Sequence, residues 1–177
     1  GRDIFARVLY GGRITLLVAI ASTAVATVLG LLLGCVAGYF GGRVDEVIMR
    51  VMDVFMAIPN MLLAIVIATT MGSGMVTTVL AVAVGSIPGF TRVVRAPILS
   101  VKSCEYIESA RAIGAKSSRI IVHHIIPNIL AQVIVQVTLG VANSIISVAG
   151  LSFLGLGVQP PTPEWGTMLS QARNYMM

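Results

Sequence analysis

Residues 14–42 read ITLLVAIASTAVATVLGLLLGCVAGYFGG and contain no Asp, Glu, Lys or Arg. Two further stretches, 54–91 and 120–163, also lack these four residue types. A helix of about 20 apolar residues crosses a bilayer, because each residue adds a rise of about 1.5 Å. The first stretch therefore predicts one membrane span. The second has room for two short spans, and the third predicts one long span followed by a loop.

The composition of the whole chain supports a membrane protein. Hydrophobic residues make up 56% of the 177 residues and charged residues 11%, and the mean hydropathy is +0.95. Soluble domains carry about 25% charged residues, so a soluble enzyme is disfavoured. High hydrophobicity also argues against a disordered chain. The prediction is an all-α, polytopic transmembrane helical bundle.

The predicted spans belong to one transmembrane domain, residues 1–177. A basic amphipathic segment comes first and a short helix on the membrane surface is expected there. The segments are an interfacial helix at 1–13, spans at 14–40, 54–71, 75–90 and 120–151, a charged loop at 91–119, and an outer loop with an amphipathic stretch at 155–177. Trp165 and Tyr175 suit a membrane-interface belt in the last segment. The chain begins with Gly1, and we interpret it as an excerpt of a longer membrane protein.

Prolines and glycines set the expected helix ends. Pro59 should bend the second span, and the Gly72–Gly74 segment should form a tight turn. Pro97 should break a helix that continues from the third span. A separate short helix is then expected at 104–115, with Ser103 as its N-cap. Gly114 is expected to end it in a left-handed conformation.

Three glycines in the first span, Gly30, Gly34 and Gly38, form a double G-x-x-x-G pattern. Small residues let two helix backbones approach closely inside a membrane, where hydrophobicity adds little to association. We interpret this row as a helix-packing face, with the general abundance of glycine in spans as the alternative.

The distribution of positive charge predicts the orientation. With four spans, segments 39–53 and 91–119 share one side and carry two and six Lys or Arg residues, against four on the other side. The positive-inside rule then places the 91–119 loop in the cytoplasm.

Motifs for catalysis, metal binding and nucleotide binding are missing. The sequence has no P-loop, no H-E-x-x-H and no G-x-S-x-G, and His123 and His124 are adjacent, which makes a poor metal pair on a helix. The two cysteines, Cys35 and Cys104, form no C-x-x-C site. We therefore expect no catalytic residue, no metal, no cofactor of its own and no nucleic-acid partner.

A row of small and polar residues follows one face of the fourth span. Its members recur every three or four residues and are Asn128, Gln132, Gln136, Gly140, Asn143 and Ser147. Polar side chains in a bilayer are costly unless they are paired or face water. The row therefore indicates either a translocation path or hydrogen bonding between helices of the bundle. The sequence leaves both open.

The charged loop resembles the EAA signature of binding-protein-dependent ABC transporter permeases. Glu108, Ala110, Gly114 and Pro127 occupy the positions of that signature, while Ser109 replaces its second alanine. His124 and Ile126 replace its Ile and Leu without changing the spacing. Segments 1–11 and 151–166 are also similar to the C-type subunits of dipeptide, oligopeptide and nickel importers. Such subunits normally have one further span on each side.

The resemblance implies that the segment around 104–115 is a coupling helix that docks in a groove of an ATPase subunit. It assigns that role to Glu105, Glu108, Ser109, Ala110, Arg111, Gly114, Ala115, Lys116 and Pro127. It also implies four kinds of partner: a second permease subunit in a heterodimer, two cytoplasmic ATPase subunits that bind ATP, an extracytoplasmic substrate-binding protein, and membrane lipid. The implied activity is uptake of a di- or oligopeptide, or of nickel or its chelate, by alternating access.

Two other classes compete with this interpretation. An ion-coupled secondary transporter or channel tends to place ionisable residues in the middle of the membrane, whereas Asp53 is expected at a span end. A membrane scaffold that transports nothing would need no polar row in the fourth span. ATP-dependent uptake after reconstitution separates all three.

Overall fold

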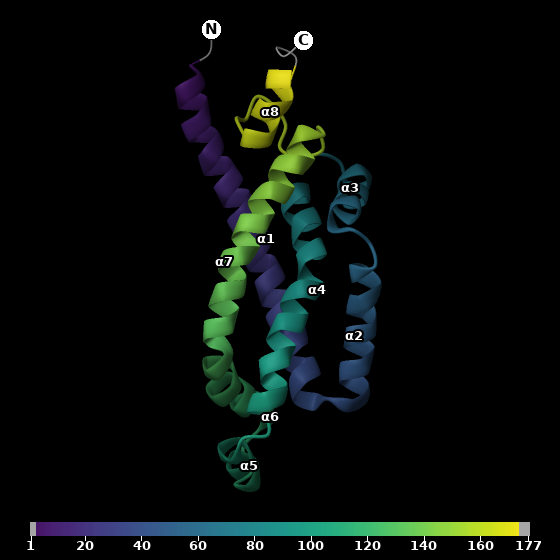
Figure 1. Ribbon diagram of the computed structural model, residues 1–177, viewed down its shortest axis with the longest axis vertical. Coiled ribbons are helices and arrows are strands. Elements are labelled where there is room, and N and C mark those ends of the chain that lie inside the picture. The colour runs from purple at the N-terminus through teal and green to yellow at the C-terminus, as the bar shows by residue number, and fades with distance from the viewer. Residues whose placement is uncertain (1–2, 174–177) are drawn as a thin grey trace. The chain divides into compact units, whose positions relative to one another are not determined.

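The computed structural model describes residues 3–173, all helices and connecting loops without a strand in that range (Figure 1). The helices are α1 (Ile4–Phe40), α2 (Gly42–Met56), α3 (Asn60–Met71), α4 (Met75–Val101), α5 (Glu105–Ala112), α6 (Ser117–Ile120), the π-helix η1 (Ile121–Ile125), α7 (Ile126–Phe153) and α8 (Trp165–Arg173). Within this range, α1, α4 and the run Ser117–Phe153 are long and apolar enough to cross a membrane. The pair α2 and α3 passes the same test together, with a bend of 84° at the break that contains Pro59. The all-α membrane fold is therefore confirmed.

The chain forms two compact units. The first unit comprises the residues up to Ala26, Ile58–Ser86 and the residues from Leu139 onward. The second unit comprises Thr27–Ala57 and Ile87–Thr138. Helices α1, α4 and α7 each contribute one part to each unit.

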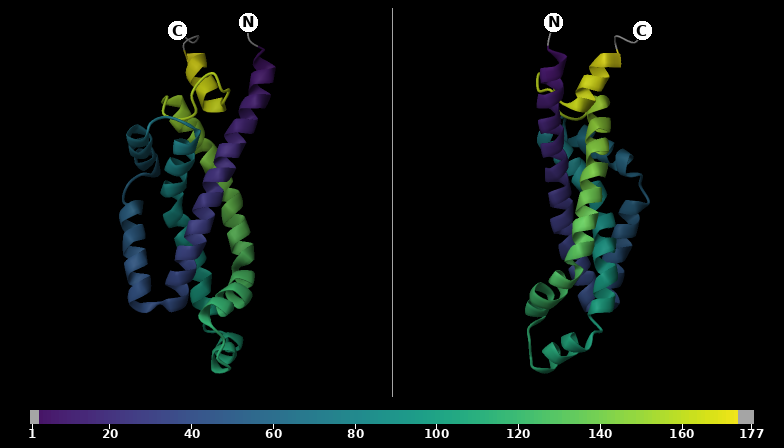
Figure 2. Two further views of the ribbon diagram at one scale, coloured as in Figure 1. Left: turned by 180° about the vertical axis from the view of Figure 1, so that it is seen from behind. Right: turned by 60° about the vertical axis from the view of Figure 1, so that its left-hand side comes forward.

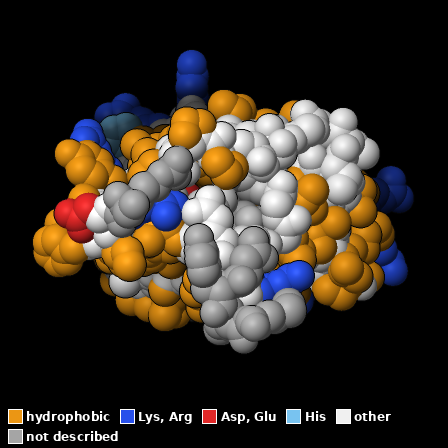
Figure 3. All heavy atoms as spheres, turned by 90° about the horizontal axis from the view of Figure 1, so that it is seen from above, with side chains coloured by type: hydrophobic (Ala, Val, Ile, Leu, Met, Phe, Trp, Pro, Cys, Tyr) orange, Lys and Arg blue, Asp and Glu red, His pale blue; other side chains and the backbone are white. Residues whose placement is uncertain are grey.

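The first unit has an apolar core with a buried acidic residue beside it. Val18 of α1, Ala64 and Ala68 of α3, and Val148 and Leu151 of α7 pack together. Because alanines make up much of this core, the helix backbones approach closely. Around this unit, hydrophobic side chains cover much of the face on which α8 lies (Figure 3).

Glu164 is fully buried in the first unit and caps the start of α8. Its carboxylate accepts hydrogen bonds from the Thr15 hydroxyl (3.0 Å) and from the Thr167 N–H (3.0 Å). The Thr167 hydroxyl donates to the Glu164 carbonyl oxygen at 2.8 Å. These bonds connect α8 to α1, and they satisfy a group that is costly to bury alone.

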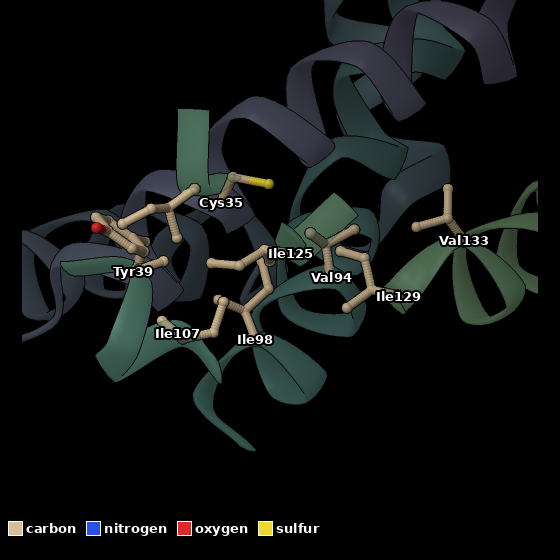
Figure 4. Close-up of a cluster of buried hydrophobic side chains, with 10 residues drawn as sticks. Cys35, Tyr39, Val94, Ile98, Ile107, Ile125, Ile129 and Val133 are labelled. Carbon is tan, nitrogen blue, oxygen red and sulfur yellow. The ribbon is translucent and has the colours of Figure 1, made fainter. Parts of the chain in front are cut away.

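The second unit has a core of branched aliphatic side chains. Val94 and Ile98 of α4 meet Ile125 and Ile129, and Ile107 of α5 packs beside Ile98 (Figure 4). α2 runs antiparallel to the second half of α4 in this unit (Figures 1 and 2). Two ion pairs join these two helices, Asp45 with Arg95 and Asp53 with Arg92.

Several element boundaries differ from the sequence prediction. The expected separate helix at 1–13 is the first part of α1, which runs unbroken from Ile4 to Phe40. Gly11 and Gly12 do not end it, because they lie within the helix where the Trp165 ring packs against them. Arg2 and Tyr175 lie outside the described residues.

The third span also continues further than predicted. Pro97 and Pro88 both lie inside α4, which ends only at Val101. Proline is tolerated in membrane helices when neighbouring groups compensate for the missing hydrogen bond. Here the close packing on α1 and the Asp45–Arg95 pair hold this part of α4 in place. The charged residues between the first and second predicted spans also form a helix, α2.

Candidate functional site

The short helix α5 is built as a capped, projecting element. Glu105 and Glu108 lie in its first turn and Arg111 in its last, which suits the helix dipole. Its N-cap is Cys104, whereas the predicted cap, Ser103, donates instead to the Ser100 carbonyl at 2.9 Å. The expected helix at 104–115 is therefore present but shorter.

Gly114 ends this helix in the left-handed conformation, with φ of 81°. The Gly114 N–H donates to the Arg111 carbonyl (2.9 Å), and the Ala115 N–H donates to the Ala110 carbonyl (3.1 Å). This pair of bonds is the Schellman motif, which favours glycine because it has no Cβ. The left-handed glycine predicted from the sequence is thus observed.

One face of α5 is held by the second unit. Ile107 and Ala110 are buried in its core, and the Arg111 guanidinium lies 5.0 Å from the centre of the Tyr39 ring. A cation over an aromatic face adds a favourable contact. Ala110 was expected at the docking surface, but it mainly packs inward, so its small size serves the internal contact.

The opposite face of α5 is open. Glu105, Glu108, Ser109 and Lys116 are exposed, and Ala115 is partly buried. Ile113, which was not among the predicted docking residues, lies beside Gly114 and is 86% exposed. An exposed aliphatic side chain therefore lies at the end of α5, next to its glycine turn.

A hollow of about 680 Å³ lies beside this face. It is lined by Tyr106, Ser109, Ile113, Gly114, Arg119 and His124, among others. Desolvation and the nearby Cys104 thiol raise the pKa of Tyr106, so its hydroxyl remains a neutral hydrogen-bond donor. The surface thus offers an apolar knob next to polar groups.

Pro127 is the second residue of α7 and follows the π-helix η1 closely. It is exposed and directly follows the first residue after η1. Because proline has no N–H, the carbonyl four residues earlier loses its usual donor. The π-helix η1, Ile121–Ile125, contains the residue that carries this carbonyl, and π-helical turns are frequent at functional sites.

The polar row of α7 is exposed or partly exposed in this chain. Asn128, Gln132 and Asn143 are exposed, and Gln136 and Ser147 are partly buried. Asn128 donates to the His124 carbonyl and Ser147 to the Asn143 carbonyl, both within the same helix. Among residues 3–173 none of these side chains bonds to another helix, so the hydrogen-bonding alternative has no support within the chain.

The three glycines of α1 lie directly against α4 in the second unit. Gly30 meets Phe90, Gly34 meets Thr91 and Val94, and Gly38 meets Ile98. A Cβ added at Gly34 would lie 2.8 Å from the Thr91 carbonyl oxygen. The three glycines therefore form a helix-packing face between α1 and α4, as their spacing predicts.

The ion pairs made by the acidic residues of α2 were not predicted from the sequence. Asp45 and Asp53 reach Arg95 and Arg92 of α4. The signal was the recurrence of charge every three or four residues from Arg43 onward, which fits a helix face. In the described part of the chain, no three His, Cys, Asp or Glu side chains are grouped as metal ligands.

Comparison with known proteins identifies the family. Residues 30–177 match the family described as Binding-protein-dependent transport system inner membrane component. The chain is 49% identical over 177 residues to a glutathione transport system permease protein of Pectobacterium atrosepticum, and it covers 59% of that protein. It is 42% identical over 176 residues to a di/tripeptide transport system permease protein of Pseudomonas aeruginosa, and 45% identical over 176 residues to a dipeptide transport system permease protein of Alkalihalophilus pseudofirmus. Both of these matches include 99% of this chain and 58% of the relative's length.

A solved structure has the same fold. The chain superposes on a chain of the inward-facing MetNI methionine ABC transporter with a TM-score of 0.77 at 18% identity. The match covers 99% of this chain and 93% of the other. The relatives are named as transport permeases rather than enzymes. The chain therefore belongs to the inner membrane components of binding-protein-dependent transport systems, the ABC transporter permeases, and it resembles their dipeptide and glutathione transport members.

Proposed function

We propose that this chain forms the membrane-spanning core of an ABC importer permease subunit that takes up di- or oligopeptides, including glutathione-like peptides. The names of the three relatives support a peptide rather than nickel or its chelate. The chain spans less than two thirds of the length of these relatives.

The observation that carries this proposal is the open face of α5. Ile113 and Gly114 project from a helix whose other face is fixed by Ile107 in the core. A cytoplasmic ATPase subunit would receive this knob in its groove and would bind and hydrolyse the ATP. Movement of α5 would pass through η1 and Pro127 to α7, because these elements are continuous in the chain.

The remaining parts of the assembly follow from this arrangement. α1, the α2–α3 pair, α4 and α7 would cross the cytoplasmic membrane, with the part of the predicted 91–119 loop that follows α4, residues 102–119, in the cytoplasm. A second permease subunit would complete the pathway, and the exposed polar row of α7 would face it or line it. An extracytoplasmic binding protein would deliver the peptide to the outer side, and alternating access would release it inside.

Reconstitution tests this proposal. The full-length protein is assembled in liposomes with its partner permease, ATPase subunits and binding protein, and uptake of a labelled dipeptide is followed. We expect uptake only with ATP and with binding protein. Uptake driven by a proton or sodium gradient without ATP would instead support a secondary transporter. The position of Asp53 no longer argues against that class, because it lies within the bent α2–α3 pair rather than at a span end.

A further inference from the structure

Helix α2 carries a stripe of charged side chains on one exposed face. The charged stripe consists of residues spaced three, four and three apart, namely Arg43, Glu46, Arg50 and Asp53. This spacing places them on one side of a helix. All four are exposed, whereas Asp45 and Met52 lie on the opposite side, where Met52 is buried and Asp45 pairs with Arg95 of α4.

The Asp53 end of the charged stripe is level with an apolar part of α1. Gly34 of α1 meets Thr91 and Val94, so Arg92 is level with this part of α1. Phe40, the last residue of α1, is about 9 Å further along the helix axis from Gly34 at 1.5 Å per residue. The exposed residues of α1 at this level, such as Leu32 at 59%, are aliphatic.

The Asp53–Arg92 pair is therefore an ion pair at a depth where α1 is suited to lipid. Its Nη2 to Oδ1 distance is 2.5 Å, and the side chains are 55% and 48% exposed, respectively. Placing a charge in hydrocarbon costs at least about 2.5–3.5 kcal/mol. Charged residues at such depth consequently face a water-filled cavity or another polar surface.

The exposed surface of α2 also has an apolar part. Val47, Val51 and Val54 lie next to the charged stripe and are 63%, 45% and 62% exposed. The helix thus presents two kinds of surface, one suited to lipid or protein and one suited to water. Such a division is typical of a helix that lies at the edge of an aqueous path.

We propose that the charged stripe of α2 lines a water-filled section of the translocation path, where Asp53 and Arg92 exchange their mutual contact for the amino and carboxylate groups of a zwitterionic peptide. This inference rests on the proposed permease function. The pair suits such a solute because it offers one charge of each sign. The Asp45–Arg95 pair, with side chains only 16% and 28% exposed, holds α2 on α4 while the outer pair opens.

Thiol accessibility tests the aqueous lining. In the assembled full-length transporter, Cys35→Ala, Cys104→Ser and replacement of every other native cysteine remove the background thiols. Single cysteines then replace Glu46, Arg50 and, as a control at the level of Asp53, Leu32. Inverted vesicles are treated with a charged methanethiosulfonate. Because only a hydrated thiol ionises and reacts readily, we expect Glu46→Cys and Arg50→Cys to react at least about tenfold faster than Leu32→Cys.

Two other outcomes would contradict the proposal that the charged stripe lines an aqueous path. If Leu32→Cys reacts equally fast, α2 lies outside the membrane. If none of the three reacts, lipid or a partner protein covers the charged stripe. In either case ATP-driven uptake by the unaltered transporter is measured in parallel, so failure of this inference is distinct from failure of the proposed function.

Neutralising each ion pair tests the contact with the peptide. The double variant Asp53→Asn with Arg92→Gln should assemble normally but should take up a zwitterionic dipeptide about 10- to 140-fold more slowly, the loss expected for charge-assisted hydrogen bonds of about 1.5–3 kcal/mol. The matched variant Asp45→Asn with Arg95→Gln should instead lower the yield of the complex. Unchanged dipeptide uptake by the first variant, at normal yield, would overturn the role of Asp53 and Arg92.

Discussion

The contact between α1 and α4 gives a stability prediction that can be worked out from the structure. In Gly34→Ala, the new Cβ would lie 2.8 Å from the Thr91 carbonyl oxygen and 2.8 Å from Val94 Cβ. Both neighbours belong to the α4 backbone or to a stiff β-branched side chain, so the helices must separate. Overpacking of this kind costs about 1–3 kcal/mol.

Gly89→Ala is a matched control on α4. A Cβ at Gly89 would meet nothing within 4 Å, and its φ lies outside the left-handed range. Both variants gain the same helix propensity, about 0.5–1 kcal/mol. The difference between them therefore isolates the packing cost, which corresponds to about a 5- to 140-fold change in the folding equilibrium.

The assay is reversible unfolding of the purified full-length protein in mixed micelles, with the free energy of unfolding measured for both variants. We expect Gly34→Ala to be less stable than Gly89→Ala by the packing cost, and Gly34→Leu to fail to assemble. Equal stability of Gly34→Ala and Gly89→Ala would refute the contact between α1 and α4 at this register.

Three further predictions concern orientation, the pathway and the buried carboxylate. Cys104 should react with an impermeant thiol reagent in inverted vesicles but not in intact cells; labelling from outside would refute the cytoplasmic position of the 91–119 loop. Gln136→Leu should lower uptake while changing stability by less than about 0.6 kcal/mol, the mean value of an interhelical hydrogen bond in a membrane. Normal uptake with reduced stability would make the row structural. Glu164→Ala should destabilise the protein by about 1–3 kcal/mol, because the Thr167 N–H loses its acceptor and the Thr15 hydroxyl keeps only the Gly11 carbonyl. Thermal unfolding against the exposed control Thr70→Val checks this.

Local patterns were sufficient for much of the fold. Stretches without charge predicted the spans, because hydrocarbon excludes charge over a fixed thickness. The bend at Pro59 and the left-handed Gly114 followed from backbone chemistry that depends on few neighbours. The glycine row of α1 was visible for the same reason, since its spacing follows directly from the helical repeat.

Features that depend on tertiary contacts could not be predicted in this way. Pro97 was expected to end a helix, but packing around α4 compensates for its missing bond. Charges at Asp45 and Asp53 indicated a polar link, but their arginine partners on α4 make a helix possible there. Glu164 looked like part of a loop, because its burial depends on Thr15 at the other end of the chain.

We propose that the turn at Gly114 docks on an ATPase subunit. A left-handed conformation costs a non-glycine residue about 1–2 kcal/mol, and the side chain of Gly114→Leu would also enlarge the surface beside Ile113. No atom of the chain lies within 4 Å of a Cβ at this position, so the bulk of the new side chain is felt chiefly at the interface. Asparagine tolerates this conformation better, which makes Gly114→Asn the milder control.

Co-purification of the ATPase with the full-length Gly114→Leu protein, measured beside ATP-driven uptake, tests this claim most directly. We predict normal amounts of the variant in the membrane, weak recovery of the ATPase and loss of uptake, with Gly114→Asn intermediate. Full recovery of the ATPase together with full uptake by Gly114→Leu would contradict the assignment of α5 as the coupling helix.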